Sequence, residues 1–438
     1  MPRPPNIVLV IADDHRADAF GGDRTDGPAT PVLNTLVCDG TLFSGARIGG
    51  GDNAAVCAPS RAALFTGRPP REALQDSAAR GYFDSLRIHP ACPLLGEALR
   101  SAGHRTHLVG KWHNDYPALN RCFDSGEALF LGGMCNHDDP LLHDYDPTGA
   151  YVPGDARRHH GFSTEIFIDA AIRFVREAAC SPQPFFLCVA LTSPHDPRTA
   201  PREFRRRYRD EDMQLPANFM PEHPFDNGEL DVRDETLAVR PRVPAEIKRH
   251  LADYHAMIEH HDHHLGRLFA ALDETGEQPR TVIAYTSDHG LALGSHGLLG
   301  KQNLYEHSVR VPLVITGPGI PAGRKIPDDA YAYRLAATLA ELAGSPAPEG
   351  AAPSLTPLFY DTFTRTPSPH FTHYRDRQHA VKLGAWKLVL HTDESGAETH
   401  RQLFNLANDP HELHDLSDEA AAAGRLSKLR ALLRNWRS

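Results

Sequence analysis

The sequence predicts an α/β fold: a large, mostly parallel central sheet flanked by helices, followed by a small C-terminal α+β subdomain. Two observations predict the sheet. Four short runs are almost entirely apolar and rich in Val, Ile, Leu or Phe, as strands buried on both faces are, and they lie at residues 6–12, 106–109, 184–192 and 281–286. Stretches with helical periodicity lie between them, such as residues 164–179 and 246–276. Strands that alternate with helices indicate a parallel sheet, because parallel neighbours need long crossovers.

A change of composition predicts the second unit. Residues 345–369 are rich in Pro and Ser, so we expect a connection over the surface there. Three short strands follow, and residues 418–437 have the pattern of an amphipathic closing helix. We therefore expect a first domain at residues 1–365, and a C-terminal subdomain with a short antiparallel sheet and a closing helix at residues 366–438.

Composition and charge disfavour several classes of protein and partner. The formal net charge is −10, which argues against a nucleic acid or an anionic membrane as the main partner. The seven Cys form no CxxC pair, so neither a disulfide framework nor a zinc ribbon is indicated. The apolar run at residues 6–12 is too short to span a bilayer, and the "MPRPP" before it leaves no room for a signal peptide. We expect a cytoplasmic protein, with a periplasmic or secreted protein whose leader has been trimmed as the alternative. The sequence gives no indication of the oligomeric state.

Polar residues of the kinds used in catalysis follow all four predicted strands. They are Asp13 and Asp14, then Lys111 and His113, then His195, and finally Asp288 and His289. An N-cap or a turn explains one such strand end, but the carboxyl ends of parallel strands share one edge, where ligands of α/β sheets bind. Four such ends therefore indicate a functional site.

The residue types in these strand ends suggest a metal-assisted site. Carboxylates such as Asp13, Asp14 and Asp288 are the hard oxygen ligands that Ca²⁺ or Mg²⁺ prefers. His289 adds a nitrogen that suits a softer metal, so the ligand types alone leave the metal open.

Further residues offer positive charge and proton transfer. Lys111 and Arg61 provide donors for a tetrahedral oxyanion, and Lys301 lies in a glycine-bounded loop. His113 and His195 are candidates for acid and base, because histidines titrate near neutrality. Together these residues predict a site for a sulfate or phosphate group.

The stretch "NAAVCAPSRAALFTGR" at residues 53–68 connects this site to a known family. With its Cys-x-Pro-Ser-Arg element, the sequence resembles the formylglycine-dependent (type I) sulfatases of the alkaline-phosphatase superfamily. The acidic pair at 13–14, "GKWH", "SPHDP", "SDHG" and "GKQNLYEHSVRVP" follow the family's order, and the tail "RQLFNLANDPHELHDLSD" is similar to its C-terminal signature. Six motifs in the family's order are specific evidence for the resemblance, whereas each motif alone would be weak evidence. The resemblance covers almost the whole chain and implies an alkaline-phosphatase-like sandwich.

The resemblance implies a nucleophile that is made after translation. Cys57 is expected to be oxidised to formylglycine by a formylglycine-generating enzyme, which reads the element containing Pro59 and Arg61. The resulting aldehyde hydrates to a gem-diol, one hydroxyl of which attacks sulfur. The implied metal ligands are Asp13, Asp14, Asp288, His289 and the side chain at position 57. Ca²⁺ is the family's usual ion, with Mg²⁺ or Mn²⁺ as alternatives.

The resemblance also implies roles for the remaining residues. His195 protonates the leaving alcohol, and Lys301 lies close to the leaving oxygen. His113 acts as the base on the second hydroxyl, so that sulfate is expelled and the aldehyde restored. Arg61 holds the gem-diol and the metal ligands, while Lys111 binds the sulfate oxygens.

Sulfate-ester hydrolysis is the main hypothesis, with two alternatives. The first is a phosphonate monoester or phosphodiester hydrolase of the same superfamily, and the second is a catalytically inactive binding protein with the sulfatase fold. Residues 114–160 and 196–245 are predicted to build the pocket walls. Arg198 and Arg202 follow His195 most closely, and we expect one of them to bind a sugar hydroxyl or carboxylate, which makes a sulfated carbohydrate the predicted substrate. The equal alternative is that "REFRRRYRD" is merely a solvated basic helix.

Histidine is abundant, and two groups of histidines lie outside these motifs. His260 and His264 share a helix face at the i,i+4 spacing of zinc sites, but the corresponding helix in relatives is a packing element, so we favour a packing role. Four other histidines lie in loops that either line the pocket or merely reflect a chain with 27 His, and they are His137, His143, His159 and His160.

Overall fold

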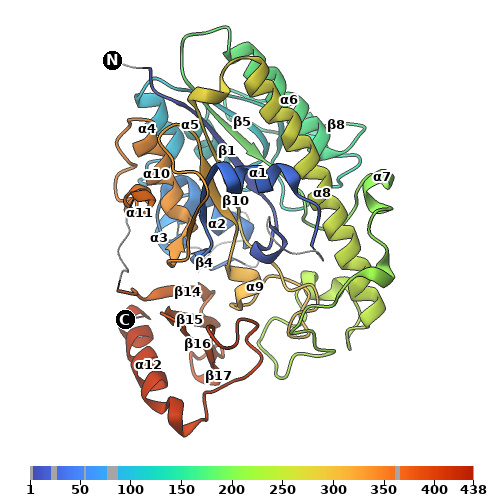
Figure 1. Ribbon diagram of the computed structural model, residues 1–438, viewed down its shortest axis with the longest axis vertical. Helices are drawn as coiled ribbons and strands as arrows, with labels where there is room; N and C mark the ends of the chain where they lie inside the picture. The colour runs from blue at the N-terminus through green and yellow to red at the C-terminus, as the bar shows by residue number, and fades with distance from the viewer. Residues whose placement is uncertain (1–2, 21–26, 54–55, 76–86, 361–365, 438) are drawn as a thin grey trace.

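The structure is a computed structural model that describes residues 3–20, 27–53, 56–75, 87–360 and 366–437. Among these residues, eight strands form the central sheet in the order β12-β2-β11-β10-β1-β9-β5-β6 (Figure 1). The strands are β1 (Asn6–Ala12), β2 (Gly40–Phe43), β5 (Arg105–Lys111), β6 (Ser125–Phe130), β9 (Phe185–Ala190), β10 (Thr281–Ser287), β11 (Leu313–Thr316) and β12 (Arg324–Ile326).

The predicted parallel sheet is confirmed. β1 pairs in parallel with β10 and β9, and β5 pairs in parallel with β9 and β6. β11 alone among these strands runs against its neighbours β10 and β2. The four apolar runs become β10, β1, β9 and β5, which are adjacent at the centre of the sheet. Their carboxyl ends therefore meet at one edge.

Helices cover both faces of the sheet and create two cores. On β1, Ile7, Leu9 and Ile11 face one core, whereas the residues between them face the other. The first core is closed by α2 (Cys57–Thr66), α4 (Leu95–Ser101), α5 (Tyr116–Cys122) and α10 (Leu335–Leu342). The second is closed by α1 (Pro31–Asp39), α6 (Ser163–Ala178) and α8 (Pro244–Glu274). Because both faces are buried, these strands read as continuous apolar runs instead of alternating ones.

Shorter elements connect this framework. They are η1 (Ala17–Ala19), β3 (Ala46–Arg47), β4 (Gly50–Gly51), α3 (Pro70–Ala73), β7 (Leu141–Leu142), η3 (Pro153–Asp155), β8 (Arg157–Arg158), α7 (Arg202–Arg205), η4 (Asp210–Asp212), η5 (Arg233–Leu237), η6 (Gln278–Arg280), α9 (Glu306–Val309), β13 (Ala330–Tyr331), η7 (Ala332–Arg334), α11 (Thr356–Tyr360) and η8 (Ala420–Ala422). The two long predicted helices are α6 and α8, and α8 begins with Pro244, whose missing N–H costs nothing in a first helical turn.

The C-terminal unit is a second sheet with a helix against it, drawn in red in Figure 1. Its strands β14 (His370–Tyr374), β15 (Gln378–Leu383), β16 (Trp386–Thr392) and β17 (Glu398–Asn405) are antiparallel. Leu429 and Leu433 of α12 (Ala423–Arg437) pack on this sheet. β4 pairs with β14, so the N-terminal part of the chain adds the edge strand. The predicted boundary at residues 365 and 366 borders 361–365, which lie outside the described residues.

The expectation of a purely surface connection at residues 345–369 is wrong in part. Leu355, Leu358 and Phe359 are buried in the first core, and the ring centroids of Phe359 and Phe43 lie 5.8 Å apart. The Pro- and Ser-rich composition describes the flanks of this segment, but three apolar side chains anchor its centre to the sheet.

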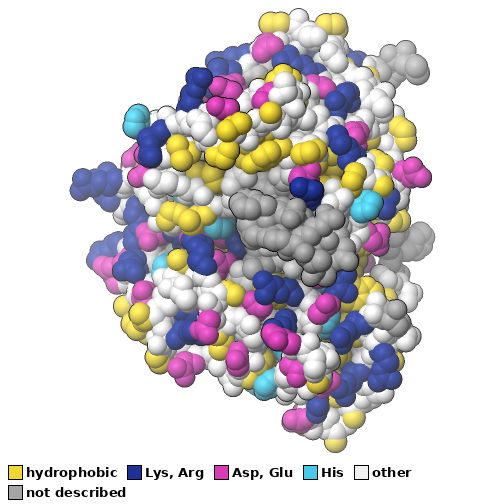
Figure 2. Space-filling view, turned by 180° about the vertical axis from the view of Figure 1, so that it is seen from behind, with side chains coloured by type: hydrophobic (Ala, Val, Ile, Leu, Met, Phe, Trp, Pro, Cys, Tyr) yellow, Lys and Arg dark blue, Asp and Glu magenta, His cyan; other side chains and the backbone are white. Residues whose placement is uncertain are grey.

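The surface carries mixed charge. On the described part of the face in Figure 2, Lys and Arg side chains are interspersed with Asp and Glu side chains. In the described ranges, no helix is both long enough and apolar enough to cross a membrane.

Many histidines are buried as neutral packing groups. Burial lowers the pKa of His107, His379 and His391 from 6.5 to about 3, and that of His223 and His296 to about 4. Because the unfolded chain takes up protons at these side chains below pH 6.5 while the folded chain does not, acid favours unfolding.

We therefore expect the free energy of unfolding to fall as the pH drops from about 6.5 towards 4. Neither ring nitrogen of His391 has a hydrogen-bond partner among the described residues, so His391→Phe should reduce this loss by about 1.4 kcal/mol per pH unit. Urea unfolding at several pH values measures the effect. His160→Phe is the control, because that side chain is 90% exposed. Equal pH dependence in wild type and His391→Phe would contradict the explanation.

Candidate active site at the carboxyl ends of the central strands

The structure brings the predicted residues of the four strand ends together with Cys57, Arg61 and Lys301. We call this set the strand-end cluster, and it consists of Asp13, Asp14, Cys57, Arg61, Lys111, His113, His195, Asp288, His289 and Lys301. None of these residues is more than 5% exposed. Charged side chains this deeply buried need partners, and they find them in one another.

Cys57 lies in the first turn of α2, a helix whose ten residues are all buried. Its Sγ atom lies 3.1 Å from His289 Nε2 and 3.5 Å from both Asp13 Oδ1 and Lys301 Nζ. Although burial raises the pKa of this thiol, the charges of Lys111 and Lys301 lower it well below 9.0. The partial positive charge of the helix N-terminus acts in the same direction. Position 57 is therefore suited to a group that carries negative charge.

Arg61, one helical turn after Cys57, links three strand ends. Its Nε donates to Asp288 Oδ2 at 2.9 Å, and its Nη1 donates to the carbonyl oxygen of Lys111 at 2.9 Å. Its Nη2 lies 3.9 Å from Asp13 Oδ2 and has no hydrogen-bond partner among the described residues. The Cys-to-Arg spacing thus places a nucleophile position and its supporting cation on one face of a helix.

An unusual backbone turn lets the adjacent carboxylates of Asp13 and Asp14 both join the cluster. Asp14 has φ 69°, a left-handed conformation that non-glycine residues rarely adopt. Tyr254 of α8 supports the turn, because its hydroxyl donates to the Asp14 carbonyl at 2.7 Å and accepts from the Arg16 N–H at 2.8 Å. The Asp14 N–H donates to Asp288 Oδ1 at 3.2 Å. Such strained conformations persist where the surroundings determine them, and they concentrate at functional sites.

A second turn of this kind follows β5. Gly110 has φ 90°, and a Cβ atom there would lie 2.1 Å from the carbonyl oxygen of Ala190 on β9. His113 has φ 61°. Between them, Lys111 Nζ donates to Asp13 Oδ2 at 2.5 Å and to the Gly133 carbonyl at 2.6 Å. The glycine of "GKWH" is thus required by the close approach of β9, and it sets the direction of Lys111.

The two candidate acid–base histidines have opposite environments. Burial, followed by the charge of Lys111, lowers the pKa of His113 to about 4. Burial also acts to lower the pKa of His195, but the negative charges of Asp14 and Asp13 and the interaction with Cys57 together outweigh it and raise the pKa to about 9. Near neutral pH, His113 is therefore a base and His195 an acid, since groups with separated pKa values divide these two tasks.

His137 supports the loop around His195. In the sequence it stood out only as one of four histidines in loops. His137 Nε2 lies 2.9 Å from the carbonyl oxygen of His195, and its Nδ1 lies 3.1 Å from Ser163 Oγ. Of the other three loop histidines, His143 packs on a tyrosine ring and His160 pairs with an aspartate on the surface. His137 is thus a positioning residue for the His195 loop.

Arg233 was missed by the sequence reasoning, although it lies in a stretch predicted to form a pocket wall. Its guanidinium pairs with both carboxylate oxygens of Asp196, the neighbour of His195, and donates to Asp234 Oδ1 at 3.0 Å. The side chain of Arg233 is 46% exposed, so it is accessible beside the buried cluster. No motif marks it, because the chain between Asp196 and Arg233 is long.

The two arginines predicted to contact substrate have different positions. Arg198 is half-buried, its Nη1 lies 3.2 Å from His250 Nδ1, and its charge helps to lower the pKa of Asp196 beside His195. Arg202 is exposed on α7, where it lines a surface hollow with other arginines. No contact among the described residues joins Arg202 to the strand-end cluster.

The basic run "REFRRRYRD" is solvated, as the alternative expected, but only residues 202–205 are helical. Arg202, Arg206, Arg207 and Arg209 are exposed. Three of its arginines also form ion pairs: Arg205 with Asp210 and Asp253, Arg207 with Glu259, and Arg209 with Glu211. These pairs fasten the run to α8 and to its own acidic neighbours.

The donor set of the cluster fits a metal ion. Ligand atoms of Asp13, Cys57, Asp288 and His289 all lie within 4.8 Å of one another, and so do those of Asp13, Asp14, Cys57 and His195. Carboxylate oxygens dominate, which favours a hard divalent cation. Lys111 and Lys301 donate to carboxylate oxygens of the same set, with Lys301 Nζ 2.9 Å from Asp14 Oδ1.

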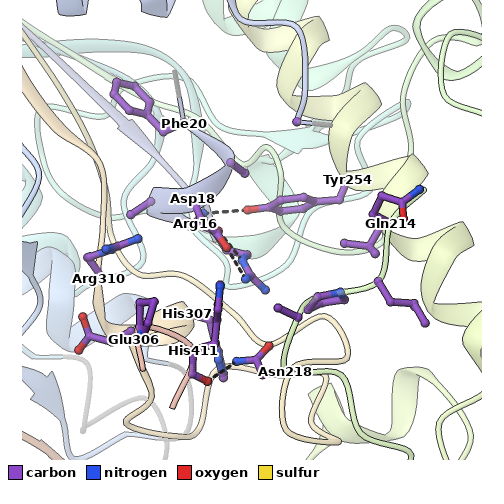
Figure 3. A pocket seen from close by; sticks show the side chains of 18 of the residues that line it. Arg16, Asp18, Phe20, Gln214, Asn218, Tyr254, Glu306, His307, Arg310 and His411 are labelled. Atoms are coloured by element: carbon purple, nitrogen blue, oxygen red, sulfur yellow. Dashed lines mark hydrogen bonds and ion pairs between the residues drawn. The ribbon is translucent and has the colours of Figure 1, made fainter. Parts of the chain in front are cut away.

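A separate cavity lies beside the turn at Asp14 (Figure 3). It has a volume of about 550 Å³ and is lined by Arg16 and Tyr254, which hold that turn, and by His307 and His411. None of its described lining residues belongs to the strand-end cluster. The cavity therefore adjoins the residues that hold the turn at Asp14, and Cys57 is not among its lining residues.

Known proteins resemble this chain along its whole length. A family model described as Sulfatase matches residues 5–345, and one described as N-sulphoglucosamine sulphohydrolase, C-terminal, matches residues 294–438. Arylsulfatase K of Danio rerio is 27% identical over 95% of this chain and 80% of its own length. Iduronate 2-sulfatase of Mus musculus is 29% identical over 78% of this chain and 69% of the mouse protein. A solved structure in complex with its substrate D-glucosamine-2-N,6-O-disulfate has a TM-score of 0.79 at 21% identity and covers 99% of this chain and 98% of that chain.

The support from Tyr254 can be tested through metal affinity. Tyr254→Phe removes the hydroxyl that holds the Asp14 carbonyl, so we expect divalent-ion binding to weaken by about 10–100-fold, the usual cost of losing an outer partner of a ligand. Calorimetric titration of the metal-free protein with Ca²⁺ measures this. Tyr208→Phe is the matched control, because that buried hydroxyl accepts a hydrogen bond from the Ala29 N–H, away from the cluster. Equal affinity in both variants would contradict the role of Tyr254.

Proposed function

The chain belongs to the sulfatase family, and we propose that it removes sulfate from a carbohydrate, using Ca²⁺ and an oxidised side chain at position 57. Family membership makes it a sulfuric ester hydrolase. The observation that carries the proposal is the position of Cys57, at the first turn of α2 and within 3.5 Å of Asp13, His289 and Lys301.

The proposed metal is Ca²⁺, with Mg²⁺ or Mn²⁺ as alternatives. The carboxylates of Asp13, Asp14 and Asp288, with His289 and the group at position 57, would hold the ion. When bound, a divalent ion supplies Lewis-acid polarisation of the sulfate oxygens and of the hydroxyl at position 57. The proposal also requires a formylglycine-generating enzyme as a maturation partner, because an unmodified thiol has neither of the two hydroxyls of the gem-diol.

The residues of the chain divide the remaining work. Lys111 and Lys301 place positive charge next to position 57, where they would stabilise negative charge that develops on the sulfate ester. His195, protonated near neutral pH, would give its proton to the leaving oxygen. His113, neutral at the same pH, would take the proton from position 57 that releases sulfate. Arg61 holds these groups in place through its hydrogen bonds to Asp288 and to the Lys111 carbonyl oxygen.

Two observations support a carbohydrate substrate. The mouse relative is named for a sulfated sugar acid. In this chain, the wall beside His195 is made of charged groups, namely Asp196, Arg198, Arg233 and Asp234. Charged donors and acceptors recognise hydroxyls and carboxylates and offer little to an apolar aryl group.

Cys57 variants and a substrate panel test the activity. Protein made in a host with the modifying enzyme should carry an aldehyde at position 57 by mass spectrometry and should hydrolyse sulfated sugars faster than aryl sulfates or choline sulfate. Cys57→Ala should lose the activity, since it removes the nucleophile. Faster cleavage of phenyl phosphonates would instead favour the phosphonate hydrolase. Sugar binding without turnover by the modified protein would favour the inactive binding protein.

Three arginine variants test the substrate wall. Arg198→Ala and Arg233→Ala should each lower kcat/KM for the preferred sulfated sugar by about tenfold or more, mainly through KM, because a hydrogen bond to a charged group is worth about 1.5–3 kcal/mol. Arg202→Ala is the matched control and should leave kcat/KM unchanged, as its side chain lies on the exposed side of α7. A loss in Arg202→Ala equal to that in the other two would contradict this assignment.

A further inference from the structure

Helices α6 and α8 run side by side on the second face of the sheet (Figure 1). Glu165 lies in the first turn of α6, opposite His260 and His264 on α8. Its Oε1 atom lies 3.2 Å from His260 Nε2 and 4.0 Å from His264 Nε2. The three ligand atoms are all within 4.8 Å of one another, and the helices are already packed in this arrangement.

We propose that Glu165, His260 and His264 bind a divalent transition-metal ion of the Zn²⁺ type, separate from the metal of the strand-end cluster. Two imidazole nitrogens and one carboxylate oxygen form a ligand set that Zn²⁺ accepts, with water in the fourth position. The strand-end cluster is rich in carboxylates and suits a hard cation, whereas two imidazoles suit a borderline one. The two sites therefore select different ions.

The surrounding contacts divide the histidine-rich stretch of α8 into two faces. His261 and Asp262 point inward: His261 Nε2 lies 3.1 Å from the Tyr285 hydroxyl, and Asp262 accepts from the N–H groups of Val32 and Leu33 on α1. These two side chains are occupied by packing. His260 and His264 face α6 instead, with their ring centroids 4.7 Å apart.

The site is held in place and is open to solvent on one side. The His260 ring packs against Phe162 and Phe204, with centroids 5.5 and 4.9 Å away. The side chains of His260 and His264 are 3% and 11% exposed, whereas that of Glu165 is 39% exposed. An ion can therefore reach two oriented imidazoles past the carboxylate.

The local charge favours a cation. Asp169 and Glu203 add negative charge next to Glu165. Among the described residues, the charged-group contacts of Glu165 are to His260 and His264, which carry positive charge only when protonated. A dication would neutralise this carboxylate and fasten α6 to α8.

Arg267 competes with the ion. Its Nη1 donates to His264 Nδ1 at 3.0 Å, which places the imidazole proton on Nε2, while its Nη2 donates to Asp169 Oδ1 at 2.7 Å. Metal binding by Nε2 moves that proton to Nδ1, so Arg267 gives up His264 and keeps Asp169. Removing Arg267 should therefore strengthen metal binding, which a cluster with a purely packing role would not show.

The experiment is a Zn²⁺ and Co²⁺ titration of the full chain in excess Ca²⁺, which under the proposed function would occupy the strand-end cluster. Wild type should bind one Zn²⁺ at this site and develop the visible absorption of Co²⁺ with nitrogen ligands. Glu165→Gln and His264→Ala should weaken binding by more than the roughly 10–100-fold cost of losing an outer partner, and Arg267→Gln should strengthen it. Zn²⁺ should also raise the Tm of wild type but not of Glu165→Gln.

Two variants keep the test specific. His263→Ala removes an exposed histidine of the same stretch and should bind as wild type does. Asp288→Asn weakens the strand-end cluster and should leave this Zn²⁺ site intact, so failure of this proposal is distinct from failure of the proposed function. Unchanged Zn²⁺ affinity in Glu165→Gln and His264→Ala, or loss of the site in Asp288→Asn, would overturn the inference. Glu165→Gln changes a partly exposed residue, so it remains informative if His264→Ala does not fold.

Discussion

The structure depends on a buried balance of charge at one edge of the sheet. Three carboxylates and three cations are almost completely removed from water, and they are Asp13, Asp14, Asp288, Arg61, Lys111 and Lys301. Breaking a buried ion pair typically costs about 3–5 kcal/mol, because it leaves an uncompensated charge. The three carboxylates directly follow β1 and β10, Lys111 ends β5, and α2 brings Arg61 to the centre, while Lys301 comes from a loop.

This balance also explains why the surrounding backbone is unusual. A consecutive pair of carboxylates cannot normally point to one place from an extended strand, since neighbouring side chains of a strand alternate. The left-handed turn at Asp14, held by Tyr254, solves that problem. A similar turn at His113 aims Lys111 and His113 into the same volume. The strain is local, and the packed sheet and α8 on either side maintain it.

The strand-end cluster and the proposed substrate wall are built in different ways. The residues around position 57 come from short motifs at strand ends and in α2, so each motif can be recognised in the sequence although the motifs lie far apart along the chain. The wall comes from long connections, in which Arg233 reaches back to Asp196 and the basic run after Arg202 is tied to α8 by ion pairs. Such connections can change without disturbing the sheet, which is how one fold serves many substrates.

The sequence by itself determined the central sheet and nearly all of the strand-end cluster. Continuous apolar runs specify strands buried on both faces, and parallel strands must end at a common edge, so the polar residues after each run had to meet. The sequence did not indicate the long-range contacts of Arg233, Tyr254 and Glu165. No local pattern marks these residues, since each contacts a group far away in the chain. The same is true of the buried centre of residues 345–369, whose composition resembles a surface loop. Only tertiary packing decides such contacts, because they depend on which surfaces meet and not on the period of any one segment.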